Sequence, residues 1–420
     1  MLDLIGDSKL VLLGEATHGT QEFYRIRAEL TKRLIRERGF SAIAAEADWP
    51  DAYRINRYVH GVGRDLDPAA ALIEFRRFPQ WMWRNTDVLD LVSWLRSYND
   101  QLAGPASRIG FYGLDLYSLH TSMAAVVSYL DVRDPDAAKR ARDRYACFDV
   151  FGQEPHDYGK AVAMGLTADC EHEVLAQLVD LMRHRNELLR RDGVLADDAQ
   201  FEAEQNARVV ANAEEYYRQA YWGGVSTWNL RDTHMADTLD ALAHHLETRG
   251  RAPKIIVWAH NSHVGDSDAM THRAERDEIT LGHLCRARHR GDVALIGFTT
   301  HGGAVTAASD WGGAAERKTV RPALRGSYEA LLHDTGVPSF VLPLRDLGEA
   351  AAALHEPRLE RAIGVVYRPE TERLSHYFEV RIADQLDAVI HIDQTRALEP
   401  LERTAEWDRG EFPETYPSGL

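Results

Sequence analysis

The sequence has few cysteines and no long apolar run, and each absence excludes a class of protein. Its three cysteines, Cys147, Cys170 and Cys285, are far apart and form no CxxC pair. We therefore expect reduced thiols in the core of a cytoplasmic protein, and no cysteine-based zinc or redox site. No uncharged run of about 18 apolar residues is present, so no membrane span is expected. The N-terminal residues also lack the basic start and the small-residue cleavage site of a secretory signal.

Three common catalytic or nucleotide-binding motifs are missing as well. The sequence contains no GxSxG, no Walker A motif and no GxGxxG after an apolar run. Serine acyl-enzyme chemistry, nucleotide-driven chemistry and dinucleotide binding are therefore disfavoured. The chain carries 65 acidic and 49 basic residues, a formal net charge of −16. This acidic balance argues against nucleic acid as a partner.

Short apolar runs indicate the fold. They occur at 10–14, 42–45, 108–113, 255–259, 293–298 and 338–342. Runs of this length are typical of parallel strands that are buried on both faces of a sheet. Between the first two, residues 20–38 have helical periodicity and end at Gly39, a good helix terminator. The pattern predicts an α/β fold, with a mostly parallel central sheet flanked by helices.

One long segment contains no convincing strand. Residues 118–247 instead show helical patterns at 118–131, 136–146, 171–192, 199–221 and 229–248. We interpret 118–247 as a helical insertion between the third and fourth strands. The α/β core would then comprise 1–117 and 248–400. The charged, proline-containing residues 401–420 are expected to form an extended, exposed tail.

Polar and titratable residues follow most of the predicted strands, where ligands bind in open α/β sheets. In chain order they are Glu15 and His18, Glu46 and Trp49, Asp115, His260 and His263, and His301. If the strands are parallel neighbours, these groups converge on one crevice.

The first two groups suggest acid–base chemistry. His18 lies between glycines and accepts a proton near neutral pH, so it is the candidate general base. Glu15 is placed to orient the imidazole or a water molecule. Glu46 ends an apolar strand, where a carboxylate must be paired or lie at the mouth of a crevice.

Arg27 falls on the apolar face of the helix predicted at 20–38. A buried arginine requires a carboxylate partner, and Glu15 and Glu46 are the candidates. The alternative is a side chain that extends to water. Arg231 and His234, in the helix predicted at 229–248, are interpreted as ordinary helix-surface groups.

His260 and His263 form an HxxH pair directly after a strand. Two interpretations stay open. Either His260 is a second acid–base group, or the two histidines join His18, Glu15 and Glu46 in chelating a divalent ion. We prefer the first, in which no metal or other cofactor is required.

Five segments together resemble the erythromycin esterase family. They are Gly-Glu-Ala-Thr-His-Gly at 14–19, Glu-Ala-Asp-Trp-Pro-Asp at 46–51, Arg-Phe-Pro-Gln-Trp-Met-Trp-Arg-Asn at 77–85, Gly-Phe-Tyr-Gly-Leu-Asp-Leu-Tyr-Ser at 110–118 and Trp-Ala-His-Asn-Ser-His at 258–263. The likeness extends from about residue 8 to about residue 400 and is closest to the environmental branch, also labelled succinoglycan biosynthesis-like.

The resemblance implies an α/β core with a helical insertion and hydrolysis of an ester or macrolide lactone. It implies water activation by the histidine that matches His18, without a covalent intermediate. The family's glutamates match Glu15 and Glu46, and its arginine matches Arg27. Its later histidine matches His260 or, less well, His263.

The lead hypothesis is therefore a metal-independent hydrolase of a small-molecule ester, with His263, Asp115 and Trp49 as substrate contacts. One alternative is a metallohydrolase that uses His18, Glu46, His260 and His263 as ligands. Another is a binding protein that takes a small acidic or glycosidic ligand without turnover.

Overall fold

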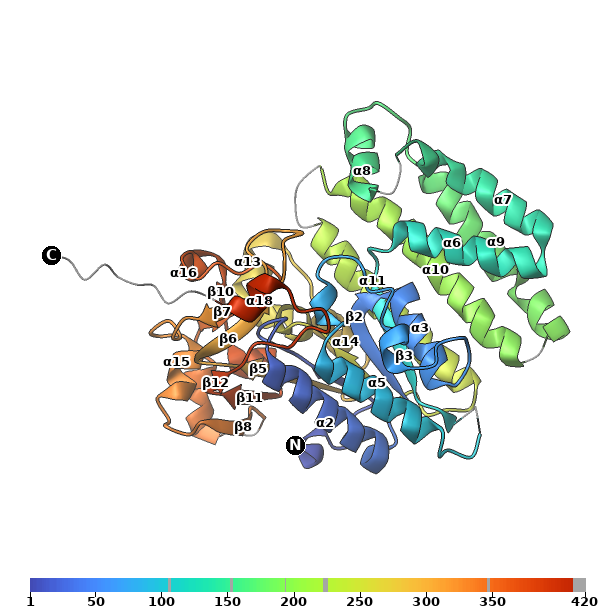
Figure 1. The fold of residues 1–420 in the computed structure, drawn as a ribbon. Coiled ribbons are helices and arrows are strands. Elements are labelled where there is room, and N and C mark those ends of the chain that lie inside the picture. Colours follow the sequence, from blue (N-terminus) through green and yellow to red (C-terminus); the bar gives the residue numbers. More distant parts are fainter. Residues whose placement is uncertain (105–106, 152–153, 193, 222–225, 346–347, 411–420) are drawn as a thin grey trace. The chain divides into compact units, whose positions relative to one another are not determined.

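A computed structural model describes residues 1–104, 107–151, 154–192, 194–221, 226–345 and 348–410 (Figure 1). The chain forms two compact units, each treated by itself below. The first comprises Met1–Ile43, Arg57–Gly110 and Arg251–Leu420. The second comprises Ala44–Asn56 and Phe111–Gly250.

The first unit is built on strands that lie in the order β4-β1-β5-β11-β8. Their bounds are Leu10–Leu13 (β1), Ile255–Trp258 (β4), Val293–Thr299 (β5), Ser339–Pro343 (β8) and Ala388–Ile392 (β11). β1 runs parallel to β4 and β5, and β11 runs parallel to β5, whereas β8 is antiparallel to β11. Because β1, β4 and β5 are parallel, the loops that follow them leave the same edge of the sheet.

Two helices of the first unit, α2 (Gln21–Arg38) and α5 (Thr86–Asn99), lie side by side (Figure 1). α2 ends where Gly39 adopts a left-handed conformation with φ of 71°, which glycine tolerates without strain. α5 begins at Asn85, whose side chain accepts a hydrogen bond from the backbone N–H of Val88. Sequence signals at both helix ends thus match the observed bounds.

The C-terminal part of the first unit adds small sheets. In one, β6 (Gly302–Ala307) lies between β7 (Glu316–Val320) and β12 (Gln394–Thr395). In the other, β9 (Arg358–Arg361) pairs with β10 (Tyr377–Val380) in antiparallel fashion. A compact apolar cluster supports this region; it consists of Val305, Ala307, Val320, Ile363 and Tyr367.

Short helices complete the first unit. They are α1 (Leu2–Ile5), α4 (Pro68–Ala71), η1 (Gln80–Met82), α12 (Asn261–Val264), η4 (Ser267–Ala269), α13 (Thr271–Arg276), α14 (Leu281–Arg288), α15 (Tyr328–His333), η5 (Gly348–Leu354), α16 (Glu372–Ser375), α17 (Ile382–Gln385) and α18 (Ala405–Arg409).

The second unit is mainly helical. Its strands are β3 (Gly110–Asp115), which begins in the first unit, and most of β2 (Ala42–Asp48); helix α3 (Trp49–Val59) follows β2. Its other helices are α6 (Leu119–Arg133), α7 (Pro135–Tyr145), η3 (Ala146–Phe151), α8 (Pro155–Ala163), α9 (Glu171–Asp192), α10 (Val194–Gln219) and α11 (Ser226–Thr248).

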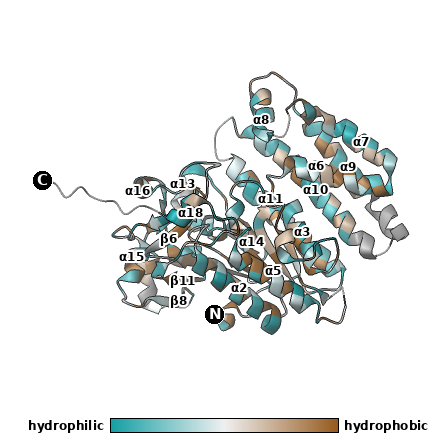
Figure 2. Cartoon of the chain, in the orientation of Figure 1, coloured by the Kyte–Doolittle hydropathy of each residue, from teal (hydrophilic) through white to brown (hydrophobic). Residues whose placement is uncertain are grey.

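An apolar core joins the helices of the second unit. Leu119, Val126 and Leu130 of α6 pack with Val210 of α10 and other buried residues. α7 contributes only a narrow apolar face, so most of it is hydrophilic in Figure 2. This agrees with a helix that covers a core from one side.

The predicted elements are present, but one strand differs in direction and burial, and several strands, among them β11 of the central sheet, were not predicted. All six apolar runs form strands, and the helices predicted within 118–247 are present with shifts of a few residues. The run at 338–342 was expected to be a buried parallel strand. β8 is instead antiparallel and alternates between exposed and half-buried residues, as expected for the edge of a sheet. The second unit also includes 44–56, outside the predicted insertion.

Two further expectations need correction. Cys147 and Cys170 form a disulfide, so only Cys285 is the free, buried thiol that was expected of all three. The segment 401–420 is not simply an extended tail, because α18 forms within it and Trp407 is buried. Residues 411–420 lie outside the described residues. Among the described residues, every helix is too short or too polar to cross a membrane.

Candidate active site

The loop after β1 holds Glu15 and His18 against each other. His18 Nδ1 lies 2.9 Å from Glu15 Oε1, and both residues are buried. The loop is anchored on the segment after β9, because Ile363 exchanges backbone hydrogen bonds with Ala16 and His18. The imidazole is therefore fixed by the backbone as well as by the carboxylate.

The glycines on either side of this loop are required by packing. A Cβ atom at Gly14 would lie 2.2 Å from Asn261 Oδ1, and one at Gly19 would lie 1.8 Å from the carbonyl oxygen of Thr306. The space beside these glycines is therefore occupied by Asn261 and by the backbone of β6.

Arg27 reaches the same carboxylate from α2. Its Nη2 donates to Glu15 Oε2 at 2.5 Å, and its side chain is only 1% exposed. The guanidinium also lies over two aromatic rings, 4.4 Å from the centroid of Tyr24 and 4.6 Å from that of Trp258. Arg27 thus has the buried carboxylate partner that its position on the apolar face of α2 predicted.

His260 approaches His18 from the end of β4. The two ring centroids are 4.7 Å apart. His260 is the N-cap of α12, where its Nδ1 accepts from the backbone N–H of Ser262 at 3.2 Å and lies 2.8 Å from Ser262 Oγ. The structure therefore brings together four of the predicted residues, Glu15, His18, Arg27 and His260, within the first unit.

Asn261 is a residue whose importance was missed. Its backbone N–H donates to the carbonyl of Glu15, and its side chain exchanges hydrogen bonds with the backbone of Phe298 on β5. Its Nδ2 also donates to Glu360, a carboxyl whose pKa is raised to about 8 by burial and by nearby Glu329. Asn261 thus links the ends of β1, β4 and β5. Two sequence signals pointed to it: Gly14, which leaves space for its side chain, and its place in the segment 258–263.

A second arginine–carboxylate cluster lies in the second unit. Arg231 of α11 donates to both oxygens of Asp115, at 3.0 and 2.7 Å, and to Glu46 at 2.7 Å. Burial alone would lower the pKa of Arg231, but Asp115 and Glu46 raise it by more, to well above its usual range. Glu46 is therefore paired with Arg231, which the sequence suggested was a surface group.

His234, one turn further along α11, is also a buried group and not a surface one. Its Nδ1 lies 2.7 Å from Asn212 Nδ2. Burial lowers the pKa of His234 to about 4, with Asp115 opposing the shift and Arg208 adding to it. The imidazole is therefore neutral at physiological pH.

Two predicted substrate contacts have other surroundings. Trp49 is 1% exposed and packs among the rings of Tyr53, Tyr112 and Phe201, in the core of the second unit. Its role as a substrate contact stays a prediction. His263 is 3% exposed, within α12. The convergence of Glu46 and Asp115 with His18 in one crevice stays a prediction.

Comparison with known proteins gives a consistent family. The family model for erythromycin esterase matches residues 35–395. Erythromycin esterase type II of Escherichia coli is 22% identical over 388 residues, covering 88% of both chains. A putative hydrolase of Bacillus subtilis, YbfO, is 22% identical over 413 residues, covering 92% of this chain and 83% of the other. These relatives support a hydrolase.

Solved structures share the fold. A succinoglycan biosynthesis protein superposes with a TM-score of 0.74 at 23% identity, covering 95% of this chain and 91% of that chain. A mutant erythromycin esterase in its open conformation superposes with a TM-score of 0.69 at 18% identity, covering 96% of this chain and 94% of that one. Because the family model spans most of the sequence, this chain belongs to the erythromycin esterase family.

Proposed function

We propose that the protein hydrolyses a carboxylic ester or a macrolide-like lactone, with His18 as the base that activates water and with no covalent intermediate. The observation that carries this proposal is the buried chain of contacts from Arg27 through Glu15 to His18. A base oriented by a carboxylate is the arrangement that water activation requires.

The contacts define which nitrogen of His18 is the base. Glu15 receives a hydrogen bond from the Arg27 guanidinium, so its carboxylate is an acceptor toward His18 as well. His18 Nδ1 must then carry the proton of the 2.9 Å contact. In the neutral imidazole this leaves Nε2 as the proton acceptor. Glu15 would also stabilise the imidazolium that forms when water loses its proton.

The contacts of His260 support a role as a proton donor. Its Nδ1 accepts from the backbone N–H of Ser262, so in the neutral ring Nε2 carries the proton. The two neighbouring rings therefore differ. His18 offers a proton acceptor at Nε2, and His260 offers a proton donor at Nε2. We propose that His260 donates a hydrogen bond to the developing oxyanion, or a proton to the leaving alkoxide.

We propose that Arg27 positions Glu15 and does not contact the oxyanion. The sequence left two roles open, bracing of the glutamates and stabilisation of the oxyanion. A side chain that is 1% exposed and lies over the Tyr24 and Trp258 rings is enclosed by protein on several sides. Bracing of Glu15 fits this environment, whereas direct contact with a substrate does not.

The family supports the proposed substrate class. The relative from Escherichia coli is named an erythromycin esterase, and the solved structures include a second erythromycin esterase and a succinoglycan biosynthesis protein. The reaction type is common to ester and lactone substrates, because both present a carbonyl carbon to attacking water. We therefore propose the ester bond as the target and leave the attached groups to experiment.

The test is mass spectrometry of macrolides, simple lactones and acyl-sugar esters after incubation with the protein. Hydrolysis of a lactone adds the mass of one water, and hydrolysis of an open ester yields an acid and an alcohol. The expected result is turnover of at least one class by the wild-type chain and its loss in His18→Ala. His283→Ala is the matched control, because His283 also contacts a carboxylate, that of Asp266, outside this site.

Two outcomes would overturn the proposal. Full turnover in His18→Ala would remove the assigned base. Turnover that disappears on removal of metal ions, returns with a divalent ion and is accompanied by loss of that ion in His18→Ala would support the metal-dependent alternative. Rapid-quench mass spectrometry of the intact protein separates direct attack from an acyl-enzyme, because only an acyl-enzyme adds the mass of the acyl group to the chain during turnover.

A further inference from the structure

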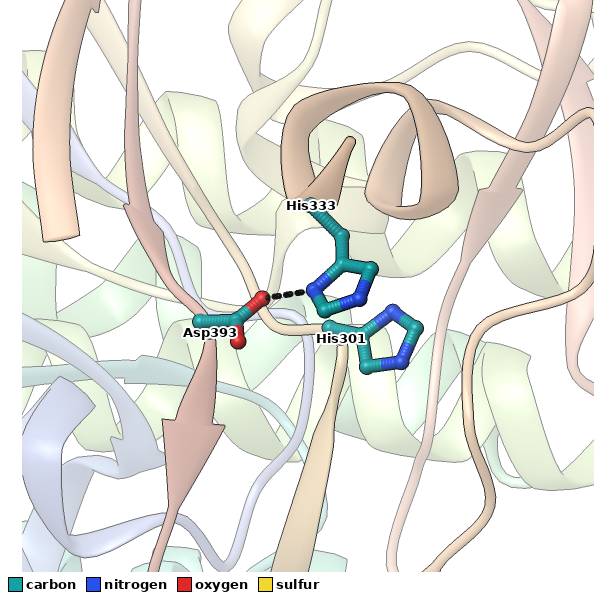
Figure 3. A group of neighbouring side chains, drawn as sticks. All are labelled: His301, His333 and Asp393. Carbon is teal, nitrogen blue, oxygen red and sulfur yellow. Dashed lines mark hydrogen bonds and ion pairs between the residues drawn. The ribbon is translucent and has the colours of Figure 1, made fainter. Parts of the chain in front are cut away.

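Three side chains of the first unit form a cluster that the proposed reaction does not use. His301 follows β5, His333 is the last residue of α15, and Asp393 follows β11. One potential ligand atom from each lies within 4.8 Å of the others. Figure 3 shows both imidazole rings beside the Asp393 carboxylate. We call these residues the 301–333–393 cluster.

We propose that the 301–333–393 cluster binds one divalent transition-metal ion, with Zn²⁺ as the best fit. The donor set is two imidazoles and one carboxylate, the set that proteins use for zinc and other first-row transition ions. Imidazole donors argue against Mg²⁺ and Ca²⁺, which prefer oxygen. This proposal rests on its own residues and is independent of the proposed hydrolase.

An unsatisfied nitrogen atom supports a missing ligand at this place. His301 Nδ1 is buried and has no hydrogen-bond partner among the described residues. The neighbouring His391 is fully buried, and its Nε2 lies 3.5 Å from Asp393 Oδ1. A buried polar atom without a partner costs stability, and a bound ion would satisfy His301 directly.

The surroundings of the cluster hold its backbone in place. Arg361, itself fully buried, donates to the backbone carbonyls of Thr300 and His301 at 3.2 and 3.1 Å. The N–H of Asp393 donates to the carbonyl of Pro338, and the carbonyl of Asp393 accepts from Gly302. Two of the three ligands are therefore attached to rigid strand ends, as a preformed metal site requires.

The third ligand has room to adjust. His333 Nδ1 lies 2.6 Å from Asp393 Oδ1, and the His333 ring stacks on His301 with centroids 3.6 Å apart. Ligand atoms around tetrahedral zinc lie about 3.3 Å apart, which follows from metal–ligand distances of about 2.0–2.1 Å. Zinc binding therefore requires His333 and Asp393 to move apart and to exchange their contact for bonds to the ion. The His333 side chain is 41% exposed, which leaves it room for this movement.

His391 would act behind the ion. Its Nδ1 lies 3.0 Å from Thr299 Oγ1, which orients the ring with Nε2 toward Asp393. A histidine that supports a ligating carboxylate in this way belongs to the outer shell of a metal site. We therefore expect His391 to strengthen binding without touching the ion.

A second group of three potential ligands provides the control. Asp266, Asp268 and His283 also lie close together. However, Arg286 already donates to Asp266 at 3.1 Å, and Arg273 lies 3.7 Å from Asp268. Arginine neutralises these carboxylates, so His283→Ala should leave zinc binding unchanged.

The test uses the full-length chain, stripped of metal with EDTA and desalted. Isothermal titration with Zn²⁺ is expected to give one equivalent bound per chain, and elemental analysis after desalting should find the same ratio. Addition of Zn²⁺ should raise the melting temperature, because the ion binds the folded state and not the unfolded one. Mg²⁺ should produce neither effect.

Variants distinguish the proposed site from zinc binding elsewhere. His333→Ala and Asp393→Asn should weaken binding by about 100-fold or more, and His391→Gln by about 10–100-fold, as for outer-shell residues. His333 is exposed enough that His333→Ala should keep the melting temperature of the metal-free chain. Absence of saturable binding in the wild type, or wild-type affinity in both His333→Ala and Asp393→Asn, would overturn the proposal.

Discussion

The two units each contain a buried arginine–carboxylate cluster, and the two clusters differ in net charge. In the first unit, Arg27 contacts one carboxylate, that of Glu15, which also contacts His18. In the second unit, Arg231 contacts two carboxylates, those of Glu46 and Asp115. The first set has no net charge when its histidine is neutral, and the second carries one negative charge.

This difference explains what each cluster is suited to do. A neutral set can accept a proton on His18, because the new positive charge lies next to Glu15. In the second set the arginine is already shared between two anions, and the nearby His234 is held neutral by burial. The first cluster therefore suits the proton transfer that we propose, and the second suits holding two carboxylates in place.

The largest effect should follow from removal of either arginine. Arg27→Ala leaves buried Glu15 without its cation, and Arg231→Ala does the same to Glu46 and Asp115. Each should lower the free energy of unfolding by about 3–5 kcal/mol, the usual cost of breaking a buried ion pair from one side. Urea unfolding followed by circular dichroism measures both.

Substitution of either arginine by lysine should affect the stability of the two clusters differently. Arg27 makes its ion pair with Glu15 through a single nitrogen, Nη2, whereas Arg231 uses Nε and Nη2 to bind Asp115 at two points. Lysine preserves a single contact better than a two-point contact. Arg27→Lys should therefore retain more stability than Arg231→Lys, and the reverse order would show that the two clusters do not differ in this way.

The second prediction concerns catalysis. His18→Ala should reduce kcat/KM for a hydrolysed ester by on the order of 10²–10⁴, the range for loss of a general base. Stability should fall by only about 1 kcal/mol, because Glu15 keeps Arg27 and loses one hydrogen bond. A His18→Ala variant that unfolds as readily as Arg27→Ala would assign the residue to structure.

The first cluster could be predicted from the sequence better than the second. Glu15 and His18 follow a recognisable strand, and Arg27 falls on an apolar helix face, so local pattern was sufficient to group them. Arg231 lies 116 residues after Asp115 and 185 after Glu46. No periodicity relates such distant positions. Glu46 at its strand end required a partner, and the sequence offered Arg27 as the candidate instead.

The same limit applies to the fold. Buried strands such as β1, β4 and β5 have continuous apolar sequences and were predicted. β8 has a similar sequence but lies at an edge, which depends on its antiparallel partner β11 and not on its own residues. The disulfide between Cys147 and Cys170 likewise depends on how η3 and the start of α9 pack, which their spacing in sequence does not determine.

The third prediction uses pH to test the second cluster. The pKa of His234 is about 4 in the folded chain, below its usual 6.5. Between these values the unfolded chain binds a proton that the folded chain does not, so stability is lost as pH falls from about 6.5 to about 4. The slope is at most about 1.4 kcal/mol per pH unit. His234→Gln should flatten it in unfolding measured across this range.

The control for this prediction is spectroscopic. The imidazole resonances of His234 should stay those of a neutral ring down to about pH 4 in the folded protein. If they titrate near pH 6.5, or if His234→Gln leaves the slope unchanged, the acid sensitivity belongs to other groups.

The smallest effects should come from the glutamates, and they compare the clusters most directly. Glu15→Gln removes the only carboxylate that both Arg27 and His18 contact in the first cluster, whereas Glu46→Gln leaves Arg231 with Asp115. The expected loss of kcat/KM is about 10-fold or more for Glu15→Gln and only a few-fold for Glu46→Gln, where 10-fold corresponds to about 1.4 kcal/mol. Both variants keep the size of the side chain, so thermal unfolding should confirm that each is folded. Equal losses would mean that Glu46 has a part in the reaction that its ion pair with Arg231 does not explain, and a larger loss for Glu46→Gln would transfer the orienting role from Glu15 to Glu46.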